Sequence, residues 1–197
     1  MMEDKDMMHE LMQKNRTIRR FDQSKPVTGG DLNEILSVAR LSASAANLQR
    51  IRYMTLSGES AQAVFPFVSM GGYLPSDKRP DRTVSPTAYI VILVPNKEPD
   101  VNLSIDVGIA AEVITLAAAE KGIGACMIRN FRAEAFLPTD TGIQLYPCLV
   151  IALGFPSEEA RVVNVSEDAS IKYYKDEQGV NCVPKRSLAE LIIEERA

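Results

Sequence analysis

Apolar positions along the chain follow two periods, which predict an interleaved series of helices and strands. Apolar residues at helical spacing predict helices over 4–14, 32–41 and 105–121. Apolar runs rich in Ile and Val predict strands over 52–56, 88–94, 125–128 and 148–155. The remaining predicted elements are a short helix over 132–137, a hairpin of 172–175 with 180–183, and a last helix ending at 193. This order predicts a mixed sheet with helices on both of its faces.

Polar residues and glycines mark the ends of the predicted helices. Thr28 and the three residues after it resemble a capping box, and Ser187 opens a full one before the last helix. Asn102 or Ser104 can open the long central helix, and Gly122 ends it.

Two further stretches have a distinctive composition. The first helix carries apolar residues at helical spacing that predict core packing, namely Met7, Met8, Leu11 and Met12. The stretch 66–86 is rich in Gly, Pro and charge, so we expect a long loop, a kind of segment that is often functional.

The composition is that of one globular domain over residues 1–197, with 46% hydrophobic and 24% charged residues. The net charge of -4 argues against a general nucleic-acid binder, which needs a positive face. Three cysteines and a single histidine, His9, give no support to a disulfide framework, a metal site or a Cys-His nucleophile. The charged start and the lack of a membrane-length apolar run predict a cytoplasmic protein without a membrane partner.

Two basic clusters stand out in this acidic chain. The basic segment, residues 16–21, combines Arg16, Thr17, Arg19 and Arg20, and such forked cations with a hydroxyl are suited to phosphate. The C-terminal basic pair, Lys185–Arg186, directly precedes a capped helix start, where backbone N–H groups attract anions. Each cluster is also compatible with a solvated surface. The apolar residues within the basic segment nevertheless favour a fixed site, because they should be buried.

The rest of the sequence offers ligand-binding groups but little catalytic machinery. The polar block, residues 42–49, carries short hydroxyl and amide side chains that can hydrogen-bond a heterocycle. No Ser-His-Asp set can be assembled, and Asp106 and Glu112 are not spaced as a facing carboxylate pair. These features together fit an enzyme whose cofactor carries the chemistry.

The order of motifs resembles that of the nitroreductase-like FMN proteins. The residues that carry this resemblance are the segments 16–21, 44–49, 122–126, 153–156 and 184–188, the last typical of small members ending in a basic pair. The resemblance covers nearly the whole chain. It implies an α+β fold, a three-layer α/β/α sandwich with a mixed, largely antiparallel central sheet.

The resemblance also implies the site residues, with no catalytic side chain because the chemistry takes place on the flavin. The FMN phosphate and ribityl chain are expected to contact Arg16, Thr17, Arg19, Arg20, Lys185 and Arg186. The flavin ring is expected to contact Ser44, Ala45, Asn47 and Gln49, commonly from the partner subunit, and the strand end Ile128, Arg129 and Asn130. The chain departs from the family pattern at Asn15, Arg50 and Arg129, where Arg, Pro, and Gly or an acidic residue are more usual.

The activity implied by the resemblance is electron transfer from NAD(P)H through FMN to a nitroaromatic, quinone or similar acceptor. A ping-pong mechanism and a homodimer with two interface flavin sites are implied as well. Three alternatives stay open: a flavin-binding dimer that serves as sensor or store, a flavin-independent anion-binding protein, and a specialised flavin reaction such as dehalogenation or flavin fragmentation.

Overall fold

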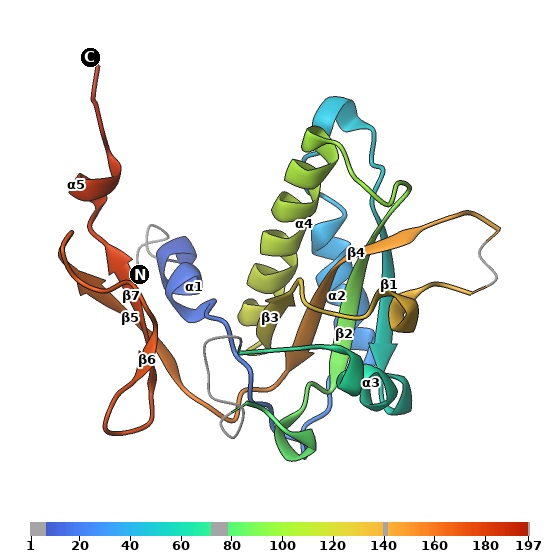
Figure 1. Cartoon of the computed structure of the whole chain (residues 1–197), viewed down its shortest axis with the longest axis horizontal. Helices are drawn as coiled ribbons and strands as arrows, with labels where there is room; N and C mark the ends of the chain where they lie inside the picture. Colours follow the sequence, from blue (N-terminus) through green and yellow to red (C-terminus); the bar gives the residue numbers. More distant parts are fainter. Residues whose placement is uncertain (1–6, 72–78, 140–141, 197) are drawn as a thin grey trace.

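The computed structural model describes residues 7–71, 79–139 and 142–196, and its main body is built on one antiparallel sheet (Figure 1). The order across the sheet is β1-β2-β4-β3, with the strands β1 (Arg52–Ser57), β2 (Ala88–Val94), β4 (Tyr146–Gly154) and β3 (Gly124–Ile128). Every neighbouring pair in this sheet is antiparallel. Strand β2 is buried along its whole length, as its continuous apolar run predicts.

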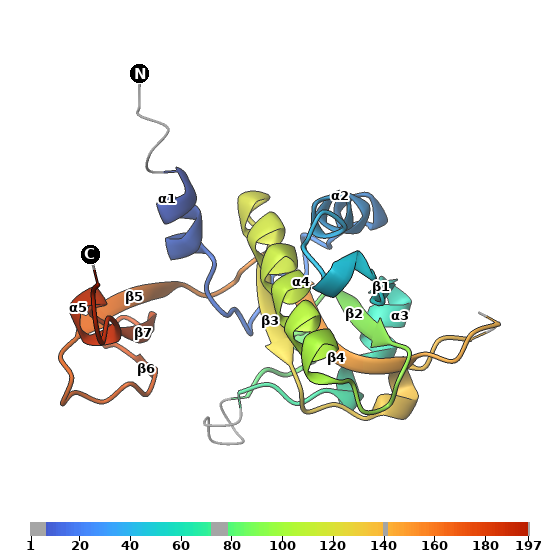
Figure 2. The ribbon, with the colours of Figure 1, turned by 90° about the horizontal axis from the view of Figure 1, so that it is seen from above.

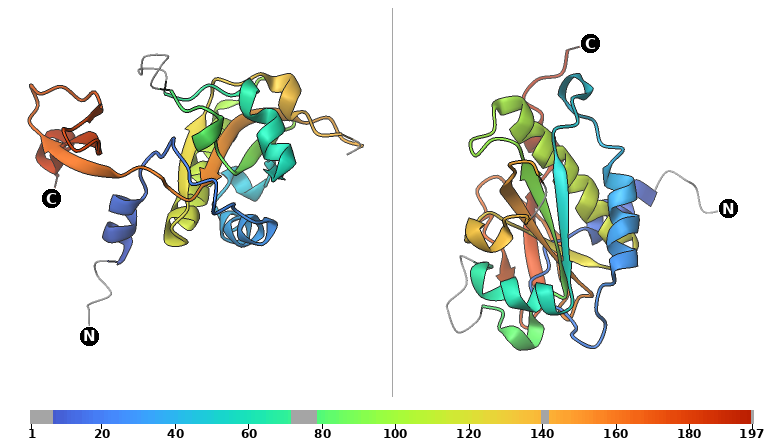
Figure 3. Two further views of the ribbon diagram at one scale, coloured as in Figure 1. Left: turned by 90° about the horizontal axis from the view of Figure 1, so that it is seen from below. Right: turned by 90° about the vertical axis from the view of Figure 1, so that its right-hand side faces the viewer.

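Helices cover both faces of this sheet, which gives the predicted three-layer α+β architecture (Figures 2 and 3). One face packs against α2 (Gly29–Ala39) and α4 (Val101–Glu120). The other packs against α3 (Glu59–Val64) and the short 3-10 turns η2 (Phe65–Phe67) and η5 (Ala133–Phe136). Alternate residues of β2 enter the two cores, Ile90 on the α4 side and Tyr89 on the α3 side, because strand side chains alternate between faces.

A smaller sheet lies beside the main body, with the helix α1 (Met7–Lys14) between the two (Figure 1). Its order is β5-β7-β6, with the strands β5 (Ala160–Val165), β7 (Asn181–Arg186) and β6 (Tyr174–Lys175). Strands β6 and β7 form the predicted hairpin, whereas β5 pairs with β7 in parallel. The remaining elements are the turns η1 (Ala45–Asn47) and η4 (Arg82–Val84) and the helix α5 (Leu188–Leu191).

Two of the predicted helix caps are formed, and the cap of α4 lies at a different residue from those predicted. The capping boxes of Thr28 before α2 and of Ser187 before α5 are both formed. The cap of α4 is Asp100 rather than Asn102 or Ser104, because its carboxylate accepts the N–H of Leu103 at 2.9 Å. Helix α4 therefore begins four residues before the predicted start at 105. Helix α5 ends two residues before the predicted end at 193.

Two predictions on helices need comment. Core packing of the methionine stripe is wrong for the single chain, because α1 has no buried residue and Met7 is 67% exposed. Helix α4 is, among the described residues, long and apolar enough to pass a length and composition test for a membrane span. Half of that window is buried against the protein, as in the core helix of a globular domain. Part of the expected 66–86 loop, residues 72–78, lies outside the described residues.

Candidate functional site

The basic segment, residues 16–21, crosses the ends of two neighbouring strands of the main sheet. Near one end the N–H of Ile18 donates to the carbonyl of Ala125 in β3 at 2.9 Å. At the other end Phe21 forms a β-bridge with Pro156, just beyond β4. The backbone of the segment is therefore fixed at both ends, which also fixes where its cationic side chains begin.

Two glycines allow the segment to approach this closely. Gly124 and Gly154 are paired across β3 and β4. A Cβ on Gly124 would lie 2.8 Å from Cβ of Ile18, and one on Gly154 would lie 2.6 Å from Cδ1 of Phe21. Both apolar side chains of the segment are buried. The predicted helix stop belongs to Gly122, whose φ is +72°.

The arginine side chains keep donors without partners. Arg16 donates through Nη2 to the carbonyl of Met12 at 2.6 Å. The Nε atoms of Arg16 and Arg19 are buried and have no hydrogen-bond partner among the described residues. The guanidinium carbon of Arg19 lies 5.0 Å from the ring centroid of Tyr173, a cation–π distance. Buried, unpartnered guanidinium donors are groups that an anion can satisfy.

Asn15 anchors the start of this segment to the long helix α4. Its side-chain amide donates to Oε1 of Glu112 and to Oγ1 of Thr115, both at 3.0 Å. Asn15, which stands where the family more often has Arg, thus links the segment to α4 through an uncharged side chain. It adds no positive charge to the neighbouring arginines.

The polar block, residues 42–49, adopts an unusual backbone. Ala46, Asn47 and Gln49 all have positive φ, from 47° to 53°, a region that costs energy for residues other than glycine. Two hydrogen bonds hold the shape: the N–H of Gln49 donates to Oγ of Ser44 at 3.1 Å, and the N–H of Ala45 donates to Oδ1 of Asp106 at 2.9 Å.

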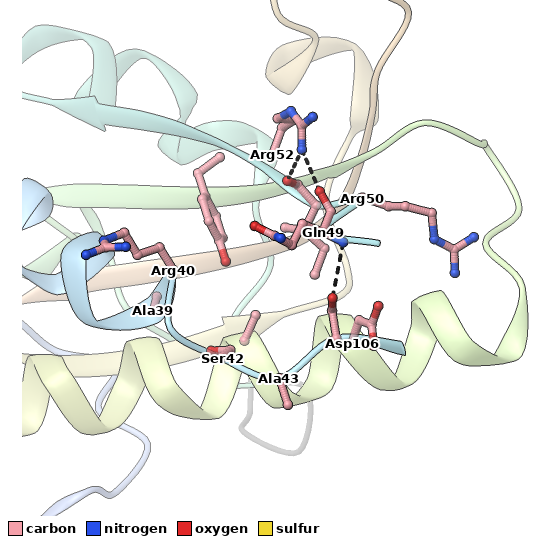
Figure 4. A pocket seen from close by; sticks show the side chains of 12 residues that line it. Ala39, Arg40, Ser42, Ala43, Gln49, Arg50, Arg52 and Asp106 are labelled. Atoms are coloured by element: carbon pink, nitrogen blue, oxygen red, sulfur yellow. Dashed lines mark hydrogen bonds between the residues drawn. The ribbon is translucent and has the colours of Figure 1, made fainter. Parts of the chain in front are cut away.

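A cavity of about 140 Å³ lies behind this block (Figure 4). It is lined by the end of α2, the polar block, the start of β1 and the inner face of α4. Asp106 and Ser42 line it, and each has a buried oxygen, Oδ2 and Oγ, without a partner among the described residues. Asp106 is only 2% exposed, so this cavity holds a buried acceptor that can receive a further donor.

Arg50 lies at the edge of this cavity, and its side chain binds Asp100, the cap of α4. Its guanidinium extends away from the cavity in Figure 4 and forms two hydrogen bonds to Asp100, at 2.6 and 3.1 Å. The hydrogen bonds from Arg50 and from the N–H of Leu103 lower the pKa of Asp100 from 3.8 to about 2. The same pairing raises the pKa of Arg50. Arg50, which stands where the family more often has Pro, is therefore paired with Asp100 in this structure.

The strand end predicted to face the flavin lies at the far end of β3. Ile128 is buried, whereas Arg129 and Asn130 are exposed. The carbonyl of Asn130 accepts the N–H of Ser69 at 2.9 Å. Along β3, Ile128 lies roughly 10 Å from the residue that contacts Ile18, at about 3.3 Å per residue, and Arg129 and Asn130 follow it. That separation suits an elongated ligand with a phosphate at one end and a ring at the other.

The C-terminal basic pair lies away from the basic segment within one chain. Lys185 and Arg186 pair with the end of β5, and Nη1 of Arg186 donates to the carbonyl of Glu167 at 3.0 Å. Lys14, next to the basic segment, lines a surface hollow with the start of β5 at Ala160. The N–H groups of Arg19 and Arg20 bind Glu158, which lies before the start of β5, whereas the basic pair lies opposite the end of β5, and no contact between the two clusters is among those described. One chain does not bring them together, so their convergence stays a prediction for an assembly.

A comparison with family models decides the classification. The model described as the nitroreductase family matches residues 12–155, which is more than half of the chain. The chain belongs to the nitroreductase family. A search of curated proteins found no match.

Solved structures share the nitroreductase fold at low identity. An FMN complex of a nitroreductase-like protein from Desulfovibrio desulfuricans is 19% identical, with a TM-score of 0.65, covering 97% of this chain and 98% of that one. A nitroreductase family protein from Streptococcus pneumoniae is 17% identical, with a TM-score of 0.65 and coverage of 96% and 100%. The FMN-dependent nitroreductase NfnB from Mycobacterium smegmatis, in complex with NADPH, is 16% identical, with a TM-score of 0.58 and coverage of 76% and 87%.

Two of the cysteines of this nitroreductase-family chain have thiols that burial keeps protonated. Cys126 is buried, and desolvation raises the pKa of its thiol to about 11. Cys148 is half-buried, and burial raises its pKa too. Both side chains pack with apolar neighbours of the cores, and both are thiols rather than thiolates at neutral pH. The described residues also contain no cluster of His, Cys, Asp or Glu suited to a metal ion.

Sequence reasoning missed the structural roles of two carboxylates in the candidate site. Asp106 holds the polar block, and its only sequence signal is a lone acid inside an otherwise apolar stretch of α4. Glu158 contacts the basic segment from the opposite end of the chain. Nothing in its local sequence marks it, because its contacts depend on how distant strands meet.

Proposed function

We propose that this chain is an FMN-dependent oxidoreductase and that residues 1–197 form one FMN-binding domain. The observation that carries the proposal is the pair of buried, unpartnered Nε donors of Arg16 and Arg19 on a backbone fixed against the sheet. The FMN in the Desulfovibrio desulfuricans neighbour supports the same choice of cofactor.

The residues present are suited to this cofactor. Forked guanidinium donors bind phosphate oxygens in pairs, and the exposed Thr17 has a hydroxyl that can add one more bond. In this proposal the phosphate and ribityl chain contact Arg16, Thr17, Arg19 and Arg20. The unpartnered donors require an acceptor to offset their desolvation, and a phosphate supplies several.

The flavin ring is proposed to lie between the polar block and the end of β3. The residues assigned to it are Ser44, Ala45, Asn47 and Gln49, and across the ring Ile128, Arg129 and Asn130. Asp106 keeps the polar block in shape, while backbone N–H groups and nearby cations favour added negative charge on a bound ligand.

The proposed reaction passes electrons from NAD(P)H to a nitroaromatic, quinone or similar acceptor by a ping-pong mechanism. Bound FMN supplies the hydride and electron chemistry, and the protein supplies binding, orientation and charge. The NADPH complex of the Mycobacterium smegmatis neighbour supports a nicotinamide donor.

We propose that the active form is a homodimer. Helix α4 exposes an apolar stripe of Val101, Ile105 and Ile109 at helical spacing, which a second subunit can cover. The C-terminal basic pair, Lys185–Arg186, is remote from the basic segment of its own chain. A dimer is the arrangement that can bring this pair, and the polar block, to a shared flavin site.

The decisive experiment is a visible spectrum of the purified protein before and after NADH or NADPH, followed by an acceptor screen. The proposal expects flavin absorption bands that bleach with a nicotinamide and return on addition of an acceptor. A yellow protein that no nicotinamide bleaches would instead indicate a sensor or store. Colourless protein with no thermal shift in FMN would reject flavin binding. Cell fractionation tests the cytoplasmic location that forms part of the proposal.

A further inference from the structure

Glu158 connects three segments that are far apart in the sequence. It lies between β4 and β5, and its side chain is only 8% exposed. One oxygen, Oε1, accepts the backbone N–H groups of Arg19 at 2.7 Å and Arg20 at 3.2 Å. The other, Oε2, accepts the side-chain amide of Asn181 at 2.8 Å and lies 3.6 Å from Nζ of Lys175.

These contacts engage both oxygens of the carboxylate. Three N–H groups donate hydrogen bonds to it, and the ammonium group of Lys175 forms an ion pair with it at 3.6 Å. Two donors come from the basic segment and two from the small sheet. A buried carboxylate with these partners has one favourable position. It therefore fixes the basic segment relative to the small sheet.

The contact with the basic segment is made to its backbone, not to its guanidinium groups. The side chains of Arg16 and Arg19 therefore keep their unpartnered Nε donors while the backbone beneath them is fixed. Tyr173, in the segment leading to β6, adds a ring 5.0 Å from the guanidinium carbon of Arg19. Residues that flank the small sheet thus contact the basic segment at both levels, Glu158 at the backbone and Tyr173 at the side chain of Arg19.

We propose that Glu158 is a positioning residue that orients the phosphate-binding arginines by joining the basic segment to the small sheet. This inference rests on the proposed FMN function. It predicts that loss of the carboxylate weakens recognition of the phosphate end of the cofactor and leaves recognition of the ring unchanged. A general loss of structure would weaken both.

The test compares FMN with riboflavin, which has the same ring and lacks the phosphate. Dissociation constants for both flavins are measured by fluorescence titration of apo-protein for wild type, E158A and the control E159A. Glu159 is adjacent and exposed, and no contact of its side chain is among those described. We expect E158A to weaken FMN binding about ten- to hundredfold, the range of charge-assisted hydrogen bonds, without changing riboflavin binding. E159A should match wild type with both flavins.

A second pair of variants covers the case in which E158A does not fold. In E158Q the amide oxygen can still accept the N–H groups of Arg19 and Arg20, while its NH₂ faces the donors of Lys175 and Asn181. N181A removes one donor from the small sheet and leaves the carboxylate in place. Both variants should weaken FMN binding less than E158A and leave riboflavin binding unchanged.

The outcomes separate the inference from the function on which it rests. Wild-type protein that binds FMN no better than riboflavin, or that binds neither, overturns the proposed phosphate site and the inference with it. Wild-type protein that prefers FMN, together with Glu158 variants that keep the same preference, overturns the inference alone. A parallel loss for both flavins assigns Glu158 a purely structural role and also overturns it.

Discussion

Replacing Gly154 with alanine tests the packing that fixes the basic segment. The new Cβ would lie 2.6 Å from Cδ1 and 2.8 Å from both Cβ and Cγ of Phe21. Relieving the nearest of these contacts requires a movement of roughly 0.9 Å, to a carbon–carbon separation of about 3.5 Å. Phe21 is fully buried, so it cannot turn into solvent. Overpacking of this kind costs about 1–3 kcal/mol of folding free energy.

Urea unfolding followed by circular dichroism measures this cost, with G29A as the matched control. Gly29 lies in the first turn of α2, and no atom lies within 4 Å of its added Cβ. G29A should therefore not destabilise the protein and should raise the free energy of unfolding by up to about 1 kcal/mol. In an F21A background the contacts with Cδ1 and Cγ are removed and only the one with Cβ remains, beside a space into which the backbone can relax, so G154A should cost less there than in the wild type. Equal stability of G154A and G29A, or an unchanged cost in the F21A background, would refute the reasoning.

Three further predictions concern the site and its surroundings. Asp106→Ala should cost about 1–3 kcal/mol of unfolding free energy, because the N–H of Ala45 loses its acceptor, whereas Asp106→Asn should recover part of the loss; equal values for the two variants would contradict the assignment. The depressed pKa of Asp100 implies that its contribution to stability is complete above about pH 4 and declines as the pH falls toward 2. Arg50→Ala should flatten that part of a thermal-melt profile against pH, and an unchanged slope would count against the pairing. Alanine at both positions of the pair 185–186 should weaken FMN binding by up to about 1.5–3 kcal/mol per lost charge-assisted bond, and unchanged affinity would remove the pair from the site.

Elements specified by local chemistry could be predicted from the sequence. The box of Thr28 and Asp31 starts α2, and the uninterrupted apolar run of β2 marks the centre of the sheet. Strand β5 was missed because its order comes from parallel pairing with β7, a non-local contact. The methionine stripe of α1 shows the opposite error, since helical spacing identifies an apolar face but not what covers it.

The candidate site likewise has features that the local sequence specifies and features that depend on contacts between distant residues. The arginines of the basic segment could be proposed from charge and residue type alone. The packing that holds the backbone of this segment could not be predicted. Gly124 and Gly154 are recognised as its contact points only once the pairing of β3 with β4 is known. Asp106 and Glu158 likewise gain meaning from backbone N–H groups that arrive from distant parts of the chain.

The hydrogen bonds of the basic segment have a consequence for synthesis on the ribosome. The N–H of Ile18 requires the carbonyl of Ala125, and that of Arg19 requires Glu158, so the partners of this early segment are translated more than a hundred residues later. The arginines of the basic segment are therefore synthesised more than a hundred residues before the groups that fix their backbone. We expect a nascent chain released before β4 to leave this segment open to proteases, and the completed polypeptide to protect it.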